Sequence, residues 1–111
     1  MWLLYFIENG ALVIQAHPFR EASYIDHIRL FPRCVHVVEV VNASSKDDEN
    51  KIAEFYAENY ELIKFAGTDN HIGNQQKNLA GMCSEKDILN ELDFICKIKN
   101  KEMDIFTIQL P

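Results

Sequence analysis

With 111 residues, the chain is long enough for one domain with a substantial core but short for an enzyme that encloses its substrate. Hydrophobic residues make up 48% of it and charged residues 25%, proportions that are ordinary for a globular protein. The formal net charge of −6 argues against a nucleic-acid surface, because such surfaces need an excess of Lys and Arg.

The cysteines and the opening residues exclude several other classes. Cys34, Cys83 and Cys96 are odd in number and widely spaced, so neither a disulfide framework nor a zinc ribbon is indicated. Reduced thiols are typical of a cytoplasmic protein, which is the location we expect. The apolar residues 1–7 are too few to span a membrane, and they lack the basic start of a signal peptide. We interpret them as the end of a helix that Gly10 closes in a left-handed conformation.

The first half of the chain predicts strands that alternate with helices. Residues 11–16 are nearly all apolar, like a strand covered on both faces, and Pro18 ends this strand. Residues 23–31 have apolar positions at roughly helical spacing and predict a helix that Pro32 ends. The valine-rich residues 35–41 predict the second strand.

The next helix and strand complete a parallel arrangement. Ser44 or Ser45 is the expected N-cap of a helix that runs to about residue 60. Its predicted core face carries large side chains at helical spacing: Ile52, Phe55, Tyr56 and Tyr60. Residues 61–66 predict the third strand. Short connections between these elements favour parallel pairing through right-handed crossovers.

The remaining residues predict a loop, two strands and a helix. Residues 72–78 are polar and loop-like, and residues 79–83 form a short apolar strand. Ser84 is the expected cap of a helix that reaches about residue 99, and residues 103–110 predict the last strand. The whole chain, residues 1–111, is therefore predicted to be one α/β domain of parallel strands alternating with helices.

Polar side chains follow each of the first three predicted strands. His17 follows the first, Asn42 the second, and Asp69 and His71 the third. Because the carboxyl ends of parallel strands meet at one rim, we expect these side chains to converge. Asp69 and His71 are two residues apart, so in extended backbone they point to the same side. A carboxylate and imidazoles can share a divalent cation, so the pattern predicts a metal site.

Each of these residues also has a structural alternative. His17 could hydrogen-bond a backbone carbonyl at the end of its strand. Asp69 could be a capping residue, with His71 exposed on a loop. Arg20 could be a solvated charge at the start of a helix. Glu39 could either line the interior near the metals or be a structural carboxylate paired with a Lys or Arg.

Three segments, taken in order, resemble the later motifs of the polymerase and histidinol phosphatase (PHP) family. They are Ala-His-Pro-x-Arg at residues 16–20, Glu-Val-x-Asn at residues 39–42 and Gly-Thr-Asp-x-His at residues 67–71. Gly81 and Met82, followed by a helix and a last strand, are similar to the usual ending of the family. The resemblance covers nearly the whole chain.

This resemblance implies a distorted (β/α)7 barrel that binds divalent metals and hydrolyses phosphate esters. The chain would be the carboxy-terminal half of that barrel, an open half-barrel. The resemblance implies that His17, Asp69 and His71 are metal ligands, and that Arg20 and Asn42 are catalytic positions near the substrate phosphate. Mixed imidazole and carboxylate ligands suit Zn²⁺, Mn²⁺ or Fe²⁺ and do not choose among them. The resemblance implies a phosphorylated small molecule or nucleotide as the substrate.

The chain departs from the family because it has no His-x-His pair, the first motif of these proteins. Its 4 histidines are His17, His27, His36 and His71, and we take His27 and His36 as helix-surface and strand-edge residues, not ligands. We therefore expect either a fragment that is inactive alone or a non-catalytic α/β structural or interaction module with vestigial metal-site residues. A half-barrel exposes sheet edges, which favours self-association. A third reading is a metal-dependent hydrolase of the amidohydrolase kind.

Overall fold

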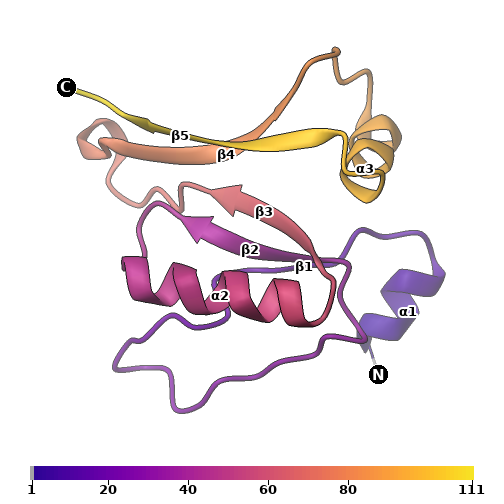
Figure 1. Cartoon of the computed structure of the whole chain (residues 1–111), viewed down its shortest axis with the longest axis horizontal. Helices are drawn as coiled ribbons and strands as arrows, with labels where there is room; N and C mark the ends of the chain where they lie inside the picture. Colours follow the sequence, from indigo (N-terminus) through magenta and orange to yellow (C-terminus); the bar gives the residue numbers. More distant parts are fainter. Residues whose placement is uncertain (1) are drawn as a thin grey trace.

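The computed structural model describes residues 2–111 (Figure 1). Its elements in chain order are α1 (Trp2–Glu8), β1 (Ile14–Gln15), β2 (Val37–Asn42), α2 (Asp47–Asn59), β3 (Ile63–Gly67), the 3-10 helix η1 (Gly73–Gln75), β4 (Asn78–Ser84), α3 (Glu91–Lys99) and β5 (Met103–Gln109). The predicted opening helix is α1, and Gly10 follows it with a left-handed φ of 85°. Met1 lies outside the described residues. Over residues 2–111, no helix has the length and apolar character needed to cross a membrane.

β2 is the central strand of a parallel sheet in the order β1-β2-β3. Its valines favour a strand that is covered on both faces. On one face, Val38 packs with Ala53 and Ala57 of α2. On the other face, Val37 packs with Ile98 of α3. The parallel pairing predicted for the first three strands is confirmed, and it places their carboxyl ends at one edge.

β4 and β5 form a second sheet and pair antiparallel over their full length. The prediction of parallel strands throughout is wrong for these two, because the chain passes through α3 and returns alongside β4 in the opposite direction (Figure 1). Thr68, directly after β3, joins the two sheets: its Oγ1 donates to Ala80 O at 2.9 Å and accepts from Ala80 N at 3.0 Å. Residues 2–111 therefore form a mixed α/β fold with a three-stranded parallel sheet, and they do not close a barrel.

Residues 23–31, predicted as a helix, form a turn, a bend and irregular backbone instead. Tyr24 is 76% exposed and Ile28 is 55% exposed, so the large side chains of this segment have no apolar surface against which a helix could pack. The Gln15 side chain donates a hydrogen bond of 2.7 Å from Nε2 to Arg29 O, which holds this backbone in its non-helical path. A helix this short needs burial to be stable in water, and here that burial is missing.

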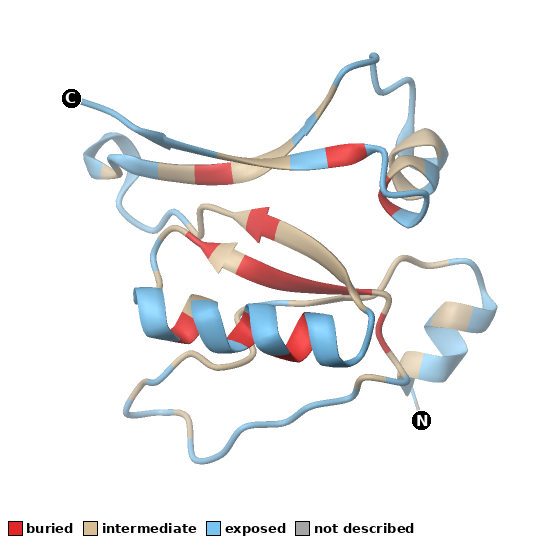
Figure 2. Ribbon diagram, in the orientation of Figure 1, coloured by how far each residue is buried: buried red, intermediate tan, exposed pale blue. Residues whose placement is uncertain are grey.

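The buried face of α2 also differs from the predicted one. We expected four large side chains to face the core: Ile52, Phe55, Tyr56 and Tyr60. Only Tyr56 of these is buried, and Phe55 is 66% exposed. The buried residues of α2 are Glu49, Ala53, Tyr56 and Ala57, and they account for the red positions of this helix in Figure 2. The last three pack against β2. The helix has a second apolar face, with Ile52 and Phe55, which is exposed. The face with the small alanines packs against the sheet because it lets the helix lie close to it.

The two longer helices begin at residues other than the predicted serines. α2 has Lys46 at its N-cap, and Glu49 Oε1 accepts a hydrogen bond of 2.8 Å from the Lys46 N–H. α3 starts after Asn90, whose Oδ1 accepts from the Asp93 N–H at 2.8 Å. Ser84, the cap expected for this last helix, is the final residue of β4. Helix starts were misplaced because several polar residues near each start can act as caps.

Candidate functional site

Asp69 lies just beyond β3 and gathers side chains from the ends of all three parallel strands. Its Oδ2 is 2.7 Å from Arg20 Nη1 and accepts a hydrogen bond of 3.1 Å from Asn42 Nδ2. His17 Nε2 is 3.9 Å from the same oxygen, and His71 Nδ1 is 3.3 Å from Asp69 Oδ1. The five residues singled out in the sequence therefore meet at one rim of the sheet, as the parallel order of strands predicts.

Two of these residues have backbone conformations that are uncommon without glycine. Asp69 has a φ of 55° and His17 a φ of 22°, both in the left-handed region. Aspartate adopts this region more readily than most residues, whereas His17 must be held there by its surroundings. Arg20 N–H donates to His17 O at 3.2 Å and closes a turn that directs the Arg20 side chain back toward Asp69.

Asn42 is the buried centre of the hydrogen-bond network. Its Nδ2 donates to Glu39 Oε2 and to Asp69 Oδ2, both at 3.1 Å. Its Oδ1 accepts from Arg20 Nη2 at 3.1 Å and from Ser44 N at 2.9 Å. The two amide hydrogens and both lone pairs of the side chain are thus used, which fixes the orientation of the amide.

Arg20 supplies the positive charge of the site. Besides its contact with Asp69, its Nη2 donates to Ser45 Oγ at 2.9 Å. Its side chain is only 16% exposed, so it is not the solvated charge that we considered as an alternative. Ser45, which we expected to cap α2, therefore orients Arg20. Because several N–H groups of the planar guanidinium contact fixed acceptors, the orientation of the Arg20 side chain is defined, unlike that of an arginine free in solvent.

The pKa of Asp69 is lowered from its usual value of 3.8. The hydrogen bond from Asn42 is the main cause, and the hydrogen bond and positive charge of Arg20 add to it, while partial burial opposes them. Each of the favourable contacts stabilises the charged carboxylate. Asp69 is therefore ionised at neutral pH and has the charge that a cation ligand needs.

We expect this pKa shift to make the protein less stable in acid. The pKa of Asp69 is lower in the folded chain than in the unfolded chain. The ionised carboxylate therefore stabilises the fold fully above pH 3.8, and this stabilisation is lost as the pH falls through the lower pKa of the folded chain. Urea unfolding at a series of pH values from neutral to below 3.8 measures this. In the Asp69→Asn variant, the free energy of unfolding should fall less steeply as the pH decreases. An identical pH dependence in the variant and the wild type would show that Asp69 is not the cause.

The site has the right kinds of ligand for a divalent cation but only part of a coordination sphere. Its two imidazoles and one carboxylate suit Zn²⁺, Mn²⁺ or Fe²⁺, and each oxygen of Asp69 faces a different histidine. Within residues 2–111, however, no three His, Cys, Asp or Glu side chains lie close enough to hold an ion. Arg20 also occupies Oδ2, and the His71 side chain is 79% exposed. The rim therefore offers ligand types that suit a divalent cation, without a complete set of them among residues 2–111.

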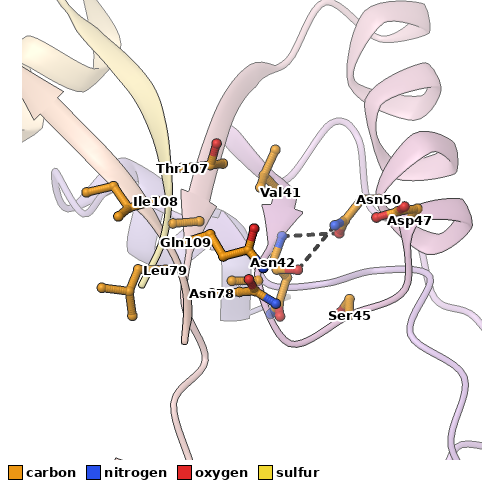
Figure 3. Close-up of a pocket in the computed structure, with 12 residues that line it drawn as sticks. Val41, Asn42, Ser45, Asp47, Asn50, Asn78, Leu79, Thr107, Ile108 and Gln109 are labelled. Atoms are coloured by element: carbon orange, nitrogen blue, oxygen red, sulfur yellow. Dashed lines mark hydrogen bonds between the residues drawn. The ribbon is translucent and has the colours of Figure 1, made fainter. Parts of the chain in front are cut away.

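A cleft of about 370 Å³ adjoins the site through Asn42, between the start of α2 and the β4–β5 sheet (Figure 3). Four amide side chains help to line it: Asn42, Asn50, Asn78 and Gln109. The Asn50 amide is fixed, because it exchanges two hydrogen bonds of 3.1 Å with the backbone N–H and C=O of Asn42. Asn78 and Gln109 are exposed. The amide edges of these two exposed residues can both donate and accept, so this side of the cleft suits an uncharged polar group.

Two residues of the site were missed or undecided in the sequence. Glu39 is 8% exposed and accepts hydrogen bonds from Asn42 and from the backbone of His17, whereas one of its two sequence alternatives was a pairing with a Lys or Arg. A carboxylate inside a valine-rich strand was the available signal, because a buried charge needs specific partners. Ser44 ties the loop after β2 to the end of β3, donating from Oγ toward Thr68 O and Asp69 O at 2.8 and 3.0 Å.

The other two histidines lie in structural settings. His36 Nδ1 accepts a hydrogen bond of 3.0 Å from the Val13 N–H, and burial, with a smaller effect of Lys99, lowers the pKa of His36. His27 Nε2 accepts from Arg29 Nε at 2.9 Å on the surface. His36 directly precedes β2, in agreement with its interpretation as a strand-edge residue, whereas His27 is exposed but does not lie on the predicted helix.

Comparison of the chain with protein-family models, with curated proteins and with solved structures gave no match. The resemblance to the PHP family therefore remains a prediction from the three motifs.

Proposed function

We propose that this chain supplies one side of a metal-dependent phosphoesterase site of the PHP type, as the carboxy-terminal portion of a partial (β/α) barrel. The main support is the 3.9 Å separation of His17 Nε2 from Asp69 Oδ2, which joins the ends of the first and third parallel strands. An acid and a histidine that lie near each other by chance would be expected within one surface loop. His17 and Asp69 instead come from the ends of two different strands. The proposed location is the cytoplasm, where widely spaced thiols stay reduced.

The residues divide into two roles. His17, Asp69 and His71 would hold the divalent ions, which when bound lower the pKa of a water and neutralise phosphate oxygens. Arg20 would bind the phosphate of the substrate, because a guanidinium offers paired donors to phosphate oxygens. Asn42, next to this phosphate position, would orient Arg20 through the hydrogen bond that its Oδ1 accepts. The amide-lined cleft beside Asn42 provides room for the rest of a phosphorylated small molecule or nucleotide.

We expect the chain to be inactive by itself. Three candidate ligands from one rim leave an ion with most of its positions open, and Arg20 competes for Asp69 through a contact of 2.7 Å. The first measurement is phosphate release from a general phosphate ester by the purified, metal-loaded chain. Turnover that His17→Ala abolishes would contradict the predicted inactivity.

Metal retention tests the proposal more directly. After loading with Zn²⁺ or Mn²⁺ and dialysis, the full chain should hold about one ion, as expected for a site with imidazole and carboxylate ligands. His17→Ala should lose this ion. His27→Ala is the matched control, because His27 pairs with Arg29 on the surface, and it should retain the ion. A wild-type chain that retains no metal would end the phosphoesterase proposal.

One observation favours a second candidate, a non-catalytic α/β module with vestigial metal-site residues. Arg20 and Asn42 already satisfy Asp69 Oδ2, so the rim forms a closed network without an ion. Such a module would act by self-association or docking through its exposed sheet edges. Sedimentation at increasing protein concentration, together with absence of retained metal, would support this reading over the enzyme.

A further inference from the structure

Glu39 is a buried carboxylate on the central strand, and both of its hydrogen bonds go to one oxygen. Glu39 Oε2 accepts from the His17 backbone N–H at 2.8 Å and from Asn42 Nδ2 at 3.1 Å. The residue is only 8% exposed and lies among the valines of β2. A carboxylate in such a place costs stability unless specific donors satisfy it. Its two donors belong to the residues that converge on Asp69.

A bulge in β2 makes this arrangement possible. Glu39 pairs with Phe65 and Val41 pairs with Ala66, so Val40 is an extra residue opposite β3. In a regular strand, residues three apart point to opposite faces. The bulge re-aims the strand, and the side chains of Glu39 and Asn42 therefore meet.

Gly67 leaves the space that Glu39 occupies. A Cβ built on Gly67 would lie 2.7 Å from Glu39 Oε1, closer than real contacts allow. The positive-φ glycines among residues 2–111 are Gly10 and Gly73, so Gly67 is not needed here for a left-handed backbone. The absent side chain at this position thus serves the carboxylate of the neighbouring strand.

We infer that Glu39 is the positioning residue of the site, which directs His17 and Asn42 toward Asp69 through this single oxygen. Its bond to the His17 N–H holds that residue at a φ of 22°, a conformation in which Nε2 lies 3.9 Å from Asp69 Oδ2. Its bond to Asn42 uses one amide hydrogen and leaves the other for Asp69. The inference rests on the proposed function only where it predicts metal affinity.

The test compares variants of the full chain by two measurements. Amide NMR reports the His17 N–H and the Asn42 side-chain NH₂ directly, and calorimetric titration with Zn²⁺ reports metal affinity. Glu39→Met removes the acceptor and keeps the volume. Glu39→Gln keeps a carbonyl oxygen that can accept both bonds. Gly67→Ala displaces the carboxylate without altering it, and Glu54→Gln, a change at an exposed ion pair with Lys64, is the control.

In Glu39→Met and Gly67→Ala, the His17 and Asn42 resonances should shift, and Zn²⁺ should bind about 10- to 100-fold more weakly, the range typical for lost outer-shell partners. Glu39→Gln should resemble the wild type, as should Glu54→Gln. Gly67→Ala keeps the test valid if Glu39→Met does not fold.

Unchanged resonances in Glu39→Met and Gly67→Ala would overturn the inference. Equal weakening by Glu39→Gln and Glu39→Met would also overturn it, since the charge and not the accepting oxygen would then matter. If the resonances shift as expected but the wild-type chain binds no Zn²⁺, the positioning role stands and the proposed function fails. The two failures are therefore distinguishable.

Discussion

Replacing Tyr56 with alanine is expected to lower the free energy of unfolding by about 3–4 kcal/mol. Tyr56 is 4% exposed and packs with Val38 and Val40 of β2. Its ring also makes an edge-to-face contact with Phe19, at a centroid distance of 5.9 Å. Truncation would leave a cavity between α2, the sheet and the turn that carries Arg20. Urea unfolding followed by circular dichroism measures the loss.

Phe55→Ala is the matched control, because Phe55 is one residue away on the same helix and 66% exposed. Its effect should stay within about 0.5 kcal/mol, as for most surface substitutions. Tyr56→Phe should cost less, about 1 kcal/mol, because it keeps the ring and removes only the hydroxyl, which hydrogen-bonds Gln15 at 3.3 Å and the backbone of Phe31. If Phe55→Ala were as destabilising as Tyr56→Ala, the helix would present a different face to the sheet.

Arg20→Ala is expected to destabilise the chain by about 2–3 kcal/mol, because it removes the cation from a partly buried carboxylate. Arg20 contacts Asp69 at 2.7 Å and also donates to Asn42 and Ser45. Without Arg20, the carboxylate of Asp69 loses its positively charged partner. Water cannot fully replace that partner, because the Asp69 side chain is only 19% exposed. Chemical denaturation at neutral pH measures the change.

A double-mutant cycle with Asp69→Ala isolates the Arg20–Asp69 interaction. The coupling energy should be about 1–2 kcal/mol, as for directly contacting charged groups that share a network. The Lys64–Glu58 pair is the control: it lies at a similar 2.8 Å, but the Glu58 side chain is 54% exposed, so its coupling should stay below about 1 kcal/mol. Equal coupling in the two pairs would show that burial adds nothing at the rim.

Local sequence patterns were sufficient for the parallel half of the fold and for the meeting of the rim residues. The valine-rich run around Val38 forms a covered strand because β-branched side chains suit it. The alternation of strands and helices predicted parallel pairing, which the structure has even though residues 16–36, between β1 and β2, form no helix. Parallel strands end at the same edge. His17 and Asp69, 52 positions apart along the chain, could for this reason be placed together without coordinates.

Contacts between distant segments decided the rest. Residues 23–31 have helical spacing but no apolar surface to cover, and α2 has two apolar faces of which only the one with Ala53 and Ala57 fits β2. The antiparallel return of β5, the bulge at Val40 and the role of Glu39 likewise depend on which strand lies alongside. The spacing of residues along the sequence shows which positions are apolar. Which of them become buried depends on the shape of the surface against which they pack, and that surface forms only in the tertiary structure.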